Sequence, residues 1–267
     1  MENYVWDETV DHSLLMHTGL GMDQIPNRTH SVDVLTLLHF LFPSVAVTST
    51  GPLISQDFEL KCIKGKENRK EDRFLDYFFL NASMKHQLII LQGGEDVEKR
   101  TNEALIRKVG ELSATRKILV IPWTTESMEK ETKYRTILCD YFSDNGFRDV
   151  LFLEKEDAEI EVSHKFDSVD VVYLPGGDTD VLYRELELRS LQDRLRDFSG
   201  IIIGNSAGAI VLSKGSHHEK GFSPGFGLVK FFITVHFKIE KECVSRHFMN
   251  PSINIPEGGW IAISGEN

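Results

Sequence analysis

The chain has 267 residues and carries 30 basic and 41 acidic side chains, which leaves a net charge of −11. With 41% hydrophobic and 27% charged residues, its composition is that of an ordinary globular protein and excludes global disorder and a fibrous structure. A strongly negative surface repels phosphate groups, so we expect neither nucleic acid nor a membrane surface as a partner.

The cysteines and the longest apolar stretch indicate the compartment. Cys62, Cys139 and Cys243 are odd in number and far apart in the sequence, which argues against a disulfide framework and a cysteine zinc site. The apolar stretch 34–47 is interrupted by a histidine and a proline and is too short to span a bilayer. We expect a buried helix at 34–47 and a soluble, cytoplasmic protein.

The sequence changes in character near Met84. Residues 1–83 show an irregular pattern without a chemical motif or a repeat, whereas later residues alternate between short apolar runs and amphipathic segments. We expect an N-terminal extension of unclear structure at 1–83 and an α/β domain at 84–267. Met84 stands just before the first apolar run, so we also consider the hypothesis that translation begins there. An intact mass near 30.4 kDa for the native protein would exclude it.

Five short runs rich in Ile, Val and Leu have the pattern of strands buried on both faces. They are residues 87–91, 117–121, 149–153, 169–174 and 200–204. Helix-like segments separate them at 97–112, 128–145 and 179–198. Asn145-Gly146 is a typical helix end, and Asp178 or Thr179 can cap the third helix. This alternation predicts an α/β fold, with a mostly parallel sheet and crossover helices.

The strongest motif is Gly204-Asn205-Ser206-Ala207-Gly208, which directly follows one of these runs. It has the form G-x-S-x-G at a strand-to-helix junction, where a tight turn exposes a serine hydroxyl. The amide of Ala207, at the start of the next helix, can face a developing oxyanion. A small-residue turn that only packs a helix against a strand is the alternative. The context favours a catalytic Ser206.

A nucleophilic serine needs a base, and the candidates are histidines that follow it in the chain. His236 follows the apolar run 231–235, which places it at or just beyond a strand end, where parallel sheets build their sites. We expect His217-His218 to lie in a Gly/Ser/Lys-rich loop, which favours a solvated surface pair over a metal site. His247 has the surroundings of a surface residue. We predict His236 as the base.

The third member should be a carboxylate that orients the histidine. Glu257 stands in Ile255-Pro256-Glu257-Gly258-Gly259, a sharp turn between two apolar runs, from which an acid can point inward. A solvated turn residue is the alternative interpretation, and Glu219 and Glu240 are rivals for the role.

A second glycine loop, Leu174-Pro175-Gly176-Gly177-Asp178-Thr179, follows a predicted strand and opens a helix. Backbone amides can approach an oxyanion closely at glycines, because no Cβ intervenes. A phosphate-binding loop would need a Lys-Ser/Thr or a G-x-G-x-x-G pattern, and neither is present here. We predict Gly177 as the second oxyanion donor, beside substrate contacts from Gly176, Asp178, Thr179 and Asn205.

The order Ser, His, Glu differs from that of the α/β-hydrolases, in which the acid precedes the histidine. Over most of 84–267 the chain resembles the peptidase E and cyanophycinase family of serine peptidases, whose fold is similar to that of class I glutamine amidotransferases. The resemblance rests on five segments in the same order: 88–91, 117–122, 173–179, 204–209 and 225–237, with Pro256-Glu257-Gly258 after them. It implies a three-layer sandwich around a mostly parallel sheet.

The resemblance also implies hydrolysis of short peptides through an acyl-enzyme, without a cofactor or a metal. Ser206 would attack, His236 would transfer the proton and Glu257 would orient the imidazole. Dipeptides with an N-terminal aspartate are the suggested substrates. Asp178 and Asp180, which stand where the family commonly has Asn and an aromatic residue, would instead repel an aspartyl side chain and suit a free amine.

Two other classes of function stay open. One is a non-catalytic, amidotransferase-like module that binds a small molecule or a partner. The other is an amidase or isopeptidase on the same fold. The sequence offers no pattern from which an oligomeric state could be derived, and a homodimer is retained only as a hypothesis.

Overall fold

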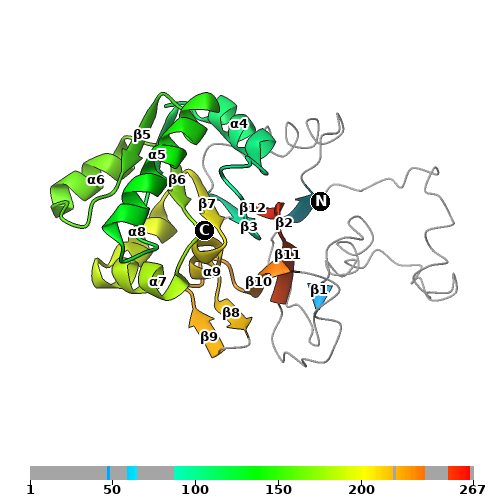
Figure 1. Cartoon of the computed structure of the whole chain (residues 1–267). Helices are drawn as coiled ribbons and strands as arrows, with labels where there is room; N and C mark the ends of the chain where they lie inside the picture. The colour runs from blue at the N-terminus through cyan, green and yellow to red at the C-terminus, as the bar shows by residue number, and fades with distance from the viewer. Residues whose placement is uncertain (1–46, 49–58, 65–86, 219–220, 238–251, 265–267) are drawn as a thin grey trace, which may run out of the picture.

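A seven-stranded sheet of order β2-β12-β3-β7-β6-β4-β5 forms the centre of the structure, a computed structural model (Figure 1). The structure describes residues 47–48, 59–64, 87–218, 221–237 and 252–264. Five of the strands run parallel to one another. These are β3 (Leu88–Gln92), β4 (Lys117–Val120), β5 (Asp149–Phe152), β6 (Val171–Leu174) and β7 (Ile201–Asn205).

The five predicted apolar runs are these five parallel strands, with ends that differ by one or two residues. Every residue of β3 and of β6 is buried, which is why both strands read as unbroken apolar runs. β5, at the end of the sheet, is only partly buried. The predicted α/β class and the mostly parallel sheet are confirmed.

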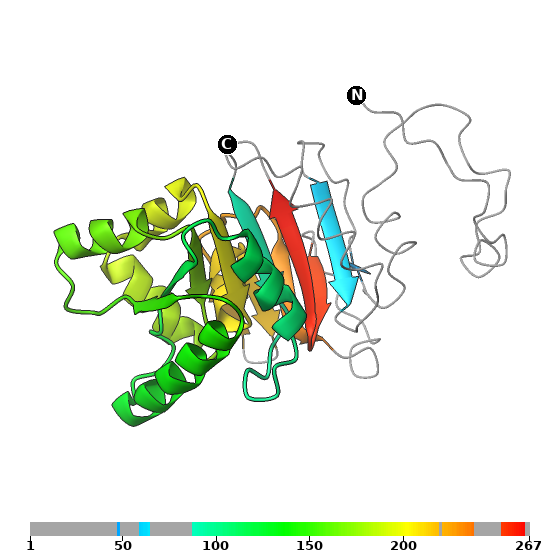
Figure 2. The ribbon, with the colours of Figure 1, turned by 90° about the horizontal axis from the view of Figure 1, so that it is seen from above.

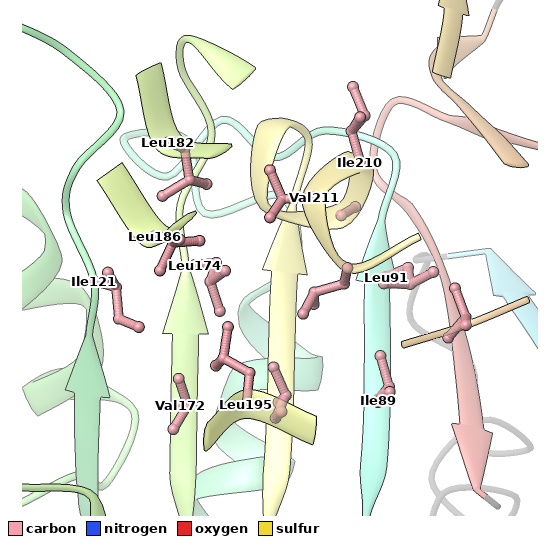
Figure 3. Packing of buried hydrophobic residues seen from close by; sticks show 14 of the residues in the cluster. Ile89, Leu91, Ile121, Val172, Leu174, Leu182, Leu186, Leu195, Ile210 and Val211 are labelled. Atoms are coloured by element: carbon pink, nitrogen blue, oxygen red, sulfur yellow. The ribbon is translucent and has the colours of Figure 1, made fainter. Parts of the chain in front are cut away.

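Helices cover both faces of this sheet and complete the three layers. On one face lie α4 (Glu103–Leu112) and α5 (Met128–Asp144), which pack on alternate strand residues such as Ile90 and Val120. On the other face lie α6 (Glu159–Asp167), α7 (Thr179–Leu188), α8 (Leu191–Asp197) and α9 (Ala207–Leu212). In Figure 3, Leu182 and Leu186 of α7 and Leu195 of α8 meet Val172 and Leu174 of β6.

Two helix predictions need correction, and one helix was not predicted. The single helix expected at 179–198 is two helices, because Ser190 adopts a left-handed conformation (φ 52°) that ends one and turns the chain into the next. The helix expected from residue 97 begins at Glu103, after a turn in which Arg100 has φ 56°. α6 is not among the predicted helices; its buried apolar positions, Val162 and Phe166, are too few to make a clear pattern.

Two further strands extend the sheet beyond β3. β12 (Gly259–Ser264) pairs antiparallel with β3, and β2 (Glu59–Lys64) pairs antiparallel with β12 over six residues. Figure 2 shows β12 in red and β2 in blue side by side at this end of the sheet. The extension predicted at 1–83 thus contributes a strand to the central sheet. The domain boundary at residue 84 stays a prediction.

Smaller elements flank the sheet. β10 (Phe232–Phe237) pairs parallel with β11 (Ser252–Pro256), and β11 pairs antiparallel with β1 (Val47–Thr48). β8 (Gly215–His218) and β9 (Gly221–Pro224) form a hairpin. Apart from Val47, the apolar stretch 34–47 lies outside the described residues. Across the part of the chain that the structure describes, none of the helices has the length and apolarity needed to cross a membrane.

Candidate active site

Ser206 stands in a strained turn between β7 and α9, at the carboxyl edge of the parallel sheet. Its backbone angles, φ 49° and ψ −101°, are rare for a residue with a side chain. The turn is possible because its glycines permit close approach: a Cβ on Gly208 would stand 2.1 Å from the carbonyl oxygen of Leu174. The amide of Ser206 donates to the carbonyl of Gln92 (3.0 Å), which ties the turn to the end of β3.

His236 lies near the end of strand β10, within a β-bulge between Thr234 and Phe237. Its φ of 53° directs the imidazole out of the ladder, as an inserted bulge residue can do. Its amide donates to the carbonyl of Gly93 (2.6 Å), and its Nε2 lies 2.7 Å from Ser206 Oγ. Sequence reasoning placed this histidine near a strand end but gave no reason for its orientation.

Glu257 stands in the turn between β11 and β12, and its Oε2 forms a hydrogen bond with His236 Nδ1. An ionised carboxylate only accepts hydrogen bonds, so in the neutral imidazole this contact selects the tautomer with the proton on Nδ1, which leaves the lone pair of Nε2 for the hydroxyl of Ser206. Half of each side chain, 50% for His236 and 49% for Glu257, is exposed, so the pair is accessible to a substrate. The rivals Glu219 and Glu240 lie outside the described residues.

The second glycine loop lies beside Ser206. A Cβ on Gly176 would stand 3.4 Å from the Cβ of Ser206. Gly177 has φ +140° and lies against Thr124, whose carbonyl accepts the amide of Asp178 (2.9 Å). Ala207 is the first residue of α9, where an amide has no partner within its own helix. Gly176 and Ala207 therefore both adjoin Ser206, and Gly177 follows Gly176 in the same loop; the oxyanion roles of Gly177 and Ala207 stay predictions.

The other residues predicted to contact a substrate are held by contacts within the fold or are partly or fully buried. Asp178 is the N-cap of α7, and its Oδ1 accepts from the amides of Asp180 (3.0 Å) and Val181 (3.1 Å). Asn205 is only 2% exposed and lies beneath Gly176. Thr179 is partly buried at the start of α7. Their contacts with a substrate stay predictions.

Two residues that sequence reasoning missed adjoin the site. Gly93 and Gly94 follow β3, and the carbonyl of Gly94 accepts the amide of Gly258 (2.9 Å). A Cβ on Gly94 would stand 2.4 Å from His236 Nδ1. A Gly-Gly pair directly after a buried parallel strand was the signal that could have identified them, because such turns line the carboxyl edge of the sheet.

The two histidines of β8 have contacts outside this site. His217 and His218 are exposed, as predicted, but they belong to strand β8 and not to a loop. His218 Nε2 lies 3.2 Å from Ser223 Oγ, which in turn donates to Asp180 Oδ1 (3.2 Å). Within the described ranges, no three His, Cys, Asp or Glu side chains are grouped as metal ligands. His247 lies outside these ranges.

The fold is similar to that of solved peptidase structures. A peptidase from an acI-B1 Actinobacterium superposes with a TM-score of 0.53 at 19% identity, over 71% of this chain and 87% of that one. A protein from Listeria monocytogenes EGD-e that is provisionally named peptidase E superposes with a TM-score of 0.49 at 17% identity, over 68% of this chain and 96% of that one. At such identities the first likeness shows the shared fold alone.

Comparison with known sequences adds a short match and a long one. The short match is to the pyridoxal 5′-phosphate synthase subunit PdxT of Francisella philomiragia, 34% identical over 61 residues. It spans 22% of this chain and only 34% of that protein. The long match is to the model of peptidase family S51, over residues 88–267, which contain the whole arrangement around Ser206. The chain therefore belongs to peptidase family S51.

Proposed function

We propose that this protein is a serine peptidase that hydrolyses short peptides through an acyl-enzyme, with Ser206 as nucleophile, His236 as base and Glu257 as the residue that orients the base. One observation carries the proposal. A chain of hydrogen bonds runs from Ser206 Oγ to His236 Nε2 (2.7 Å) and from His236 Nδ1 to Glu257 Oε2, across three separate loops. Membership of a peptidase family supports the same conclusion.

The proposed reaction follows from this geometry. Ser206 Oγ attacks the carbonyl carbon of the scissile peptide bond while its proton passes to His236 Nε2, and Glu257 stabilises the imidazolium. The amides of Gly177 and Ala207 donate to the oxyanion. His236 then returns the proton to the leaving amine as the C–N bond breaks. A water molecule, deprotonated by the same imidazole, attacks the acyl carbon; the ester C–O bond breaks and His236 returns the proton to Ser206 Oγ.

The proposed substrates are dipeptides and other short peptides. Family resemblance suggests an N-terminal aspartate, whereas the exposed carboxylates of Asp178 and Asp180 near the site favour a free amine. Asp178 accepts from two amides at the start of α7 and Asp180 accepts from Ser223 Oγ, so both stay candidates for an amine contact. A panel that contains Asp-X and neutral dipeptides separates these two preferences.

The experiment is labelling of the full chain with a fluorophosphonate probe, with Ser206→Ala as its control. We expect labelling of the wild type that is lost in the variant, together with cleavage of at least one dipeptide in the panel. Equal labelling of both proteins, or none, would show that the turn is structural and would favour a binding module. Labelling without peptide cleavage, but with release of ammonia from amides, would favour an amidase.

A further inference from the structure

The turn of residues 92–95 connects the three segments that carry Ser206, His236 and Glu257. The carbonyl of Gln92 accepts the amide of Ser206 (3.0 Å), and the carbonyl of Gly93 accepts the amide of His236 (2.6 Å). Gly93 and Gly94 also exchange hydrogen bonds with the turn that carries Glu257, through Gly259 O and Gly258 N (2.9 Å each). Any displacement of this turn therefore moves the three groups relative to one another.

Glu95 ends this turn, and its partly buried carboxyl group has three hydrogen-bond partners. Oε1 accepts from the hydroxyl of Tyr141 on α5 and from the amide of Asn102 (3.2 Å), just before α4. Oε2 accepts from Gln92 Nε2 (3.2 Å). These contacts join the turn to both helices on this face of the sheet. Glu95 thus ties the turn to the face of the sheet that α4 and α5 cover.

Asn102 carries the connection onward to the loop of Glu257. Its side chain is 3% exposed, and its amide, oriented so that both ends find partners, donates to Gly258 O (2.9 Å) and accepts from Gln92 Nε2 (3.0 Å). Gln92 Nε2 therefore has one proton for Glu95 and one for Asn102. The sequence of contacts from Glu95 to Gly258 is continuous, and Gly258 is the neighbour of Glu257.

Burial disfavours the ionised form of the Glu95 carboxyl group. Burial raises the pKa of Glu95, and the hydrogen bonds from Tyr141, Asn102 and Gln92 only partly oppose that effect. Burial also raises the pKa of Tyr141, so its hydroxyl keeps the proton that it shares with the carboxyl. A carboxylate is more stable in water than in a partly buried site, so its burial at this position costs free energy. We take this cost as a sign that Glu95 holds its neighbours in place.

We propose that Glu95 is a positioning residue: through Gln92 and Asn102 it holds the turn of residues 92–95 and the loop of Glu257 in the geometry that aligns His236 with Ser206. This role rests on the proposed serine-peptidase function. In this proposal Glu95 touches neither the substrate nor the reacting atoms. Its effect is therefore on the rate of reaction at Ser206 and not on the binding of a ligand.

The test compares Glu95→Gln and Asn102→Ala in the full chain with Asp170→Asn. Glu95→Gln keeps the shape but sets an amide donor against Gln92 Nε2, and Asn102→Ala removes the donor to Gly258 O. Asp170 is the matched control, because its carboxylate also accepts several hydrogen bonds but lies before β6, at the opposite edge of the sheet. Two readouts are measured: fluorophosphonate inactivation, resolved into kinact and KI, and the downfield proton NMR signal of His236 Nδ1–H.

In Glu95→Gln and Asn102→Ala we expect kinact to fall about tenfold or more, since misplacement of a reacting group by about 1 Å costs about 100-fold in rate. KI should stay unchanged, and the NMR signal should shift or broaden. Asp170→Asn should change neither readout. Should Glu95→Gln fail to fold, Tyr141→Phe, which deletes one hydroxyl, should show the same changes to a smaller extent.

A wild-type value of kinact in both Glu95→Gln and Asn102→Ala would overturn the positioning role. An equal fall of kinact in Asp170→Asn would overturn it as well. If the wild type itself does not react with the probe, the proposed function fails, and the NMR signal then decides the positioning role on its own. An unmoved signal in Glu95→Gln and Asn102→Ala would refute it, and a displaced signal would uphold it.

Discussion

Gly94 lies against the imidazole of His236 so closely that a Cβ on the glycine would stand 2.3 Å from His236 Cε1. The same Cβ would stand 2.6 Å from Glu257 Oε2. Gly94 also has φ +148°, which side-chain-bearing residues rarely adopt. The close contact of His236 and Glu257 therefore depends on the absence of a side chain at this position.

Gly94→Ala should lower kcat/KM about 100-fold or more, because the new methyl group displaces the imidazole from Ser206. The measurement is peptide hydrolysis, or fluorophosphonate labelling, at a temperature where the variant is folded. Gly221→Ala is the matched control. Gly221 has φ +140°, but a Cβ on it would have no atom of the described residues within 4 Å, so this variant tests backbone strain. Equal losses in both variants would contradict the steric explanation.

Glu257→Gln should lower kcat on the order of 10³-fold, because a neutral amide stabilises the imidazolium less than a carboxylate does and can hold the wrong tautomer. Steady-state kinetics on the best peptide of the panel measures this loss. Thermal unfolding should change little, since half of the side chain is exposed. Full activity in this variant would show that another acid orients His236, with Glu219 and Glu240 as the candidates.

Gly177→Ala should lower kcat by about 10²- to 10³-fold, the range expected for loss of one oxyanion donor. A Cβ at this position would stand 2.6 Å from Thr124 Oγ1 and would displace the amide from the site. Gly176→Ala is the comparison, because its Cβ would be 3.4 Å from the nearest atom. A larger loss in Gly176→Ala than in Gly177→Ala would remove Gly177 from the oxyanion role.

Asp170→Asn should lower the free energy of unfolding by about 2 kcal/mol at neutral pH, because the carboxylate accepts from Ser113, Thr115 and the amide of Ala114. Burial acts to raise the pKa of Asp170, but these hydrogen bonds outweigh it and hold the pKa below its ordinary value. A lowered pKa in the folded state means stability that is present above the unfolded-state pKa, about 3.9, and lost as the pH falls further.

Urea unfolding of both proteins at a series of pH values checks this prediction. The difference between wild type and Asp170→Asn should be constant near neutral pH and should shrink below about pH 4. A difference that does not depend on pH would mean that the charge of Asp170 contributes nothing and that only its shape matters.

A chain that begins at Met84 should unfold at a lower temperature than the full chain. It lacks β2, so β12 would become an edge strand with unpaired backbone groups over the six residues that now pair with β2. Thermal unfolding of the two chains measures the effect, and fluorophosphonate labelling shows whether the site survives. Equal melting temperatures would support a domain boundary at residue 84.

Much of the central sheet could be predicted because its strands are buried on both faces. The run that became β6 is entirely buried, and such a strand has an unbroken apolar sequence. The end of α7 could not be predicted in the same way. Leu186 and Leu191 are both buried, so the apolar pattern continues across the break at Ser190, and only the backbone conformation there separates two helices.

The residues of the candidate site were predicted by type and order, but their mutual geometry was not. Ser206, His236 and Glu257 stand on three segments of the chain and are separated by 30 and 21 residues. Nothing in the local sequence specifies the bulge that turns His236 toward Ser206. The turn of residues 92–95 also escaped prediction, because its direct hydrogen bonds to the segments of Ser206, His236 and Glu257 come from backbone groups, which leave no pattern of residue types.

By itself, the sequence determined the α/β class, the strand-turn-helix around Ser206 and the glycine loop at 176–177, since each depends on residues that are neighbours in the chain. Only the tertiary structure decided that Gly94 adjoins His236, that Asn102 contacts the loop of Glu257 and that β2 joins the central sheet. Those contacts join segments far apart in the sequence. Packing and backbone hydrogen bonds select them, and neither leaves a local pattern of residue types.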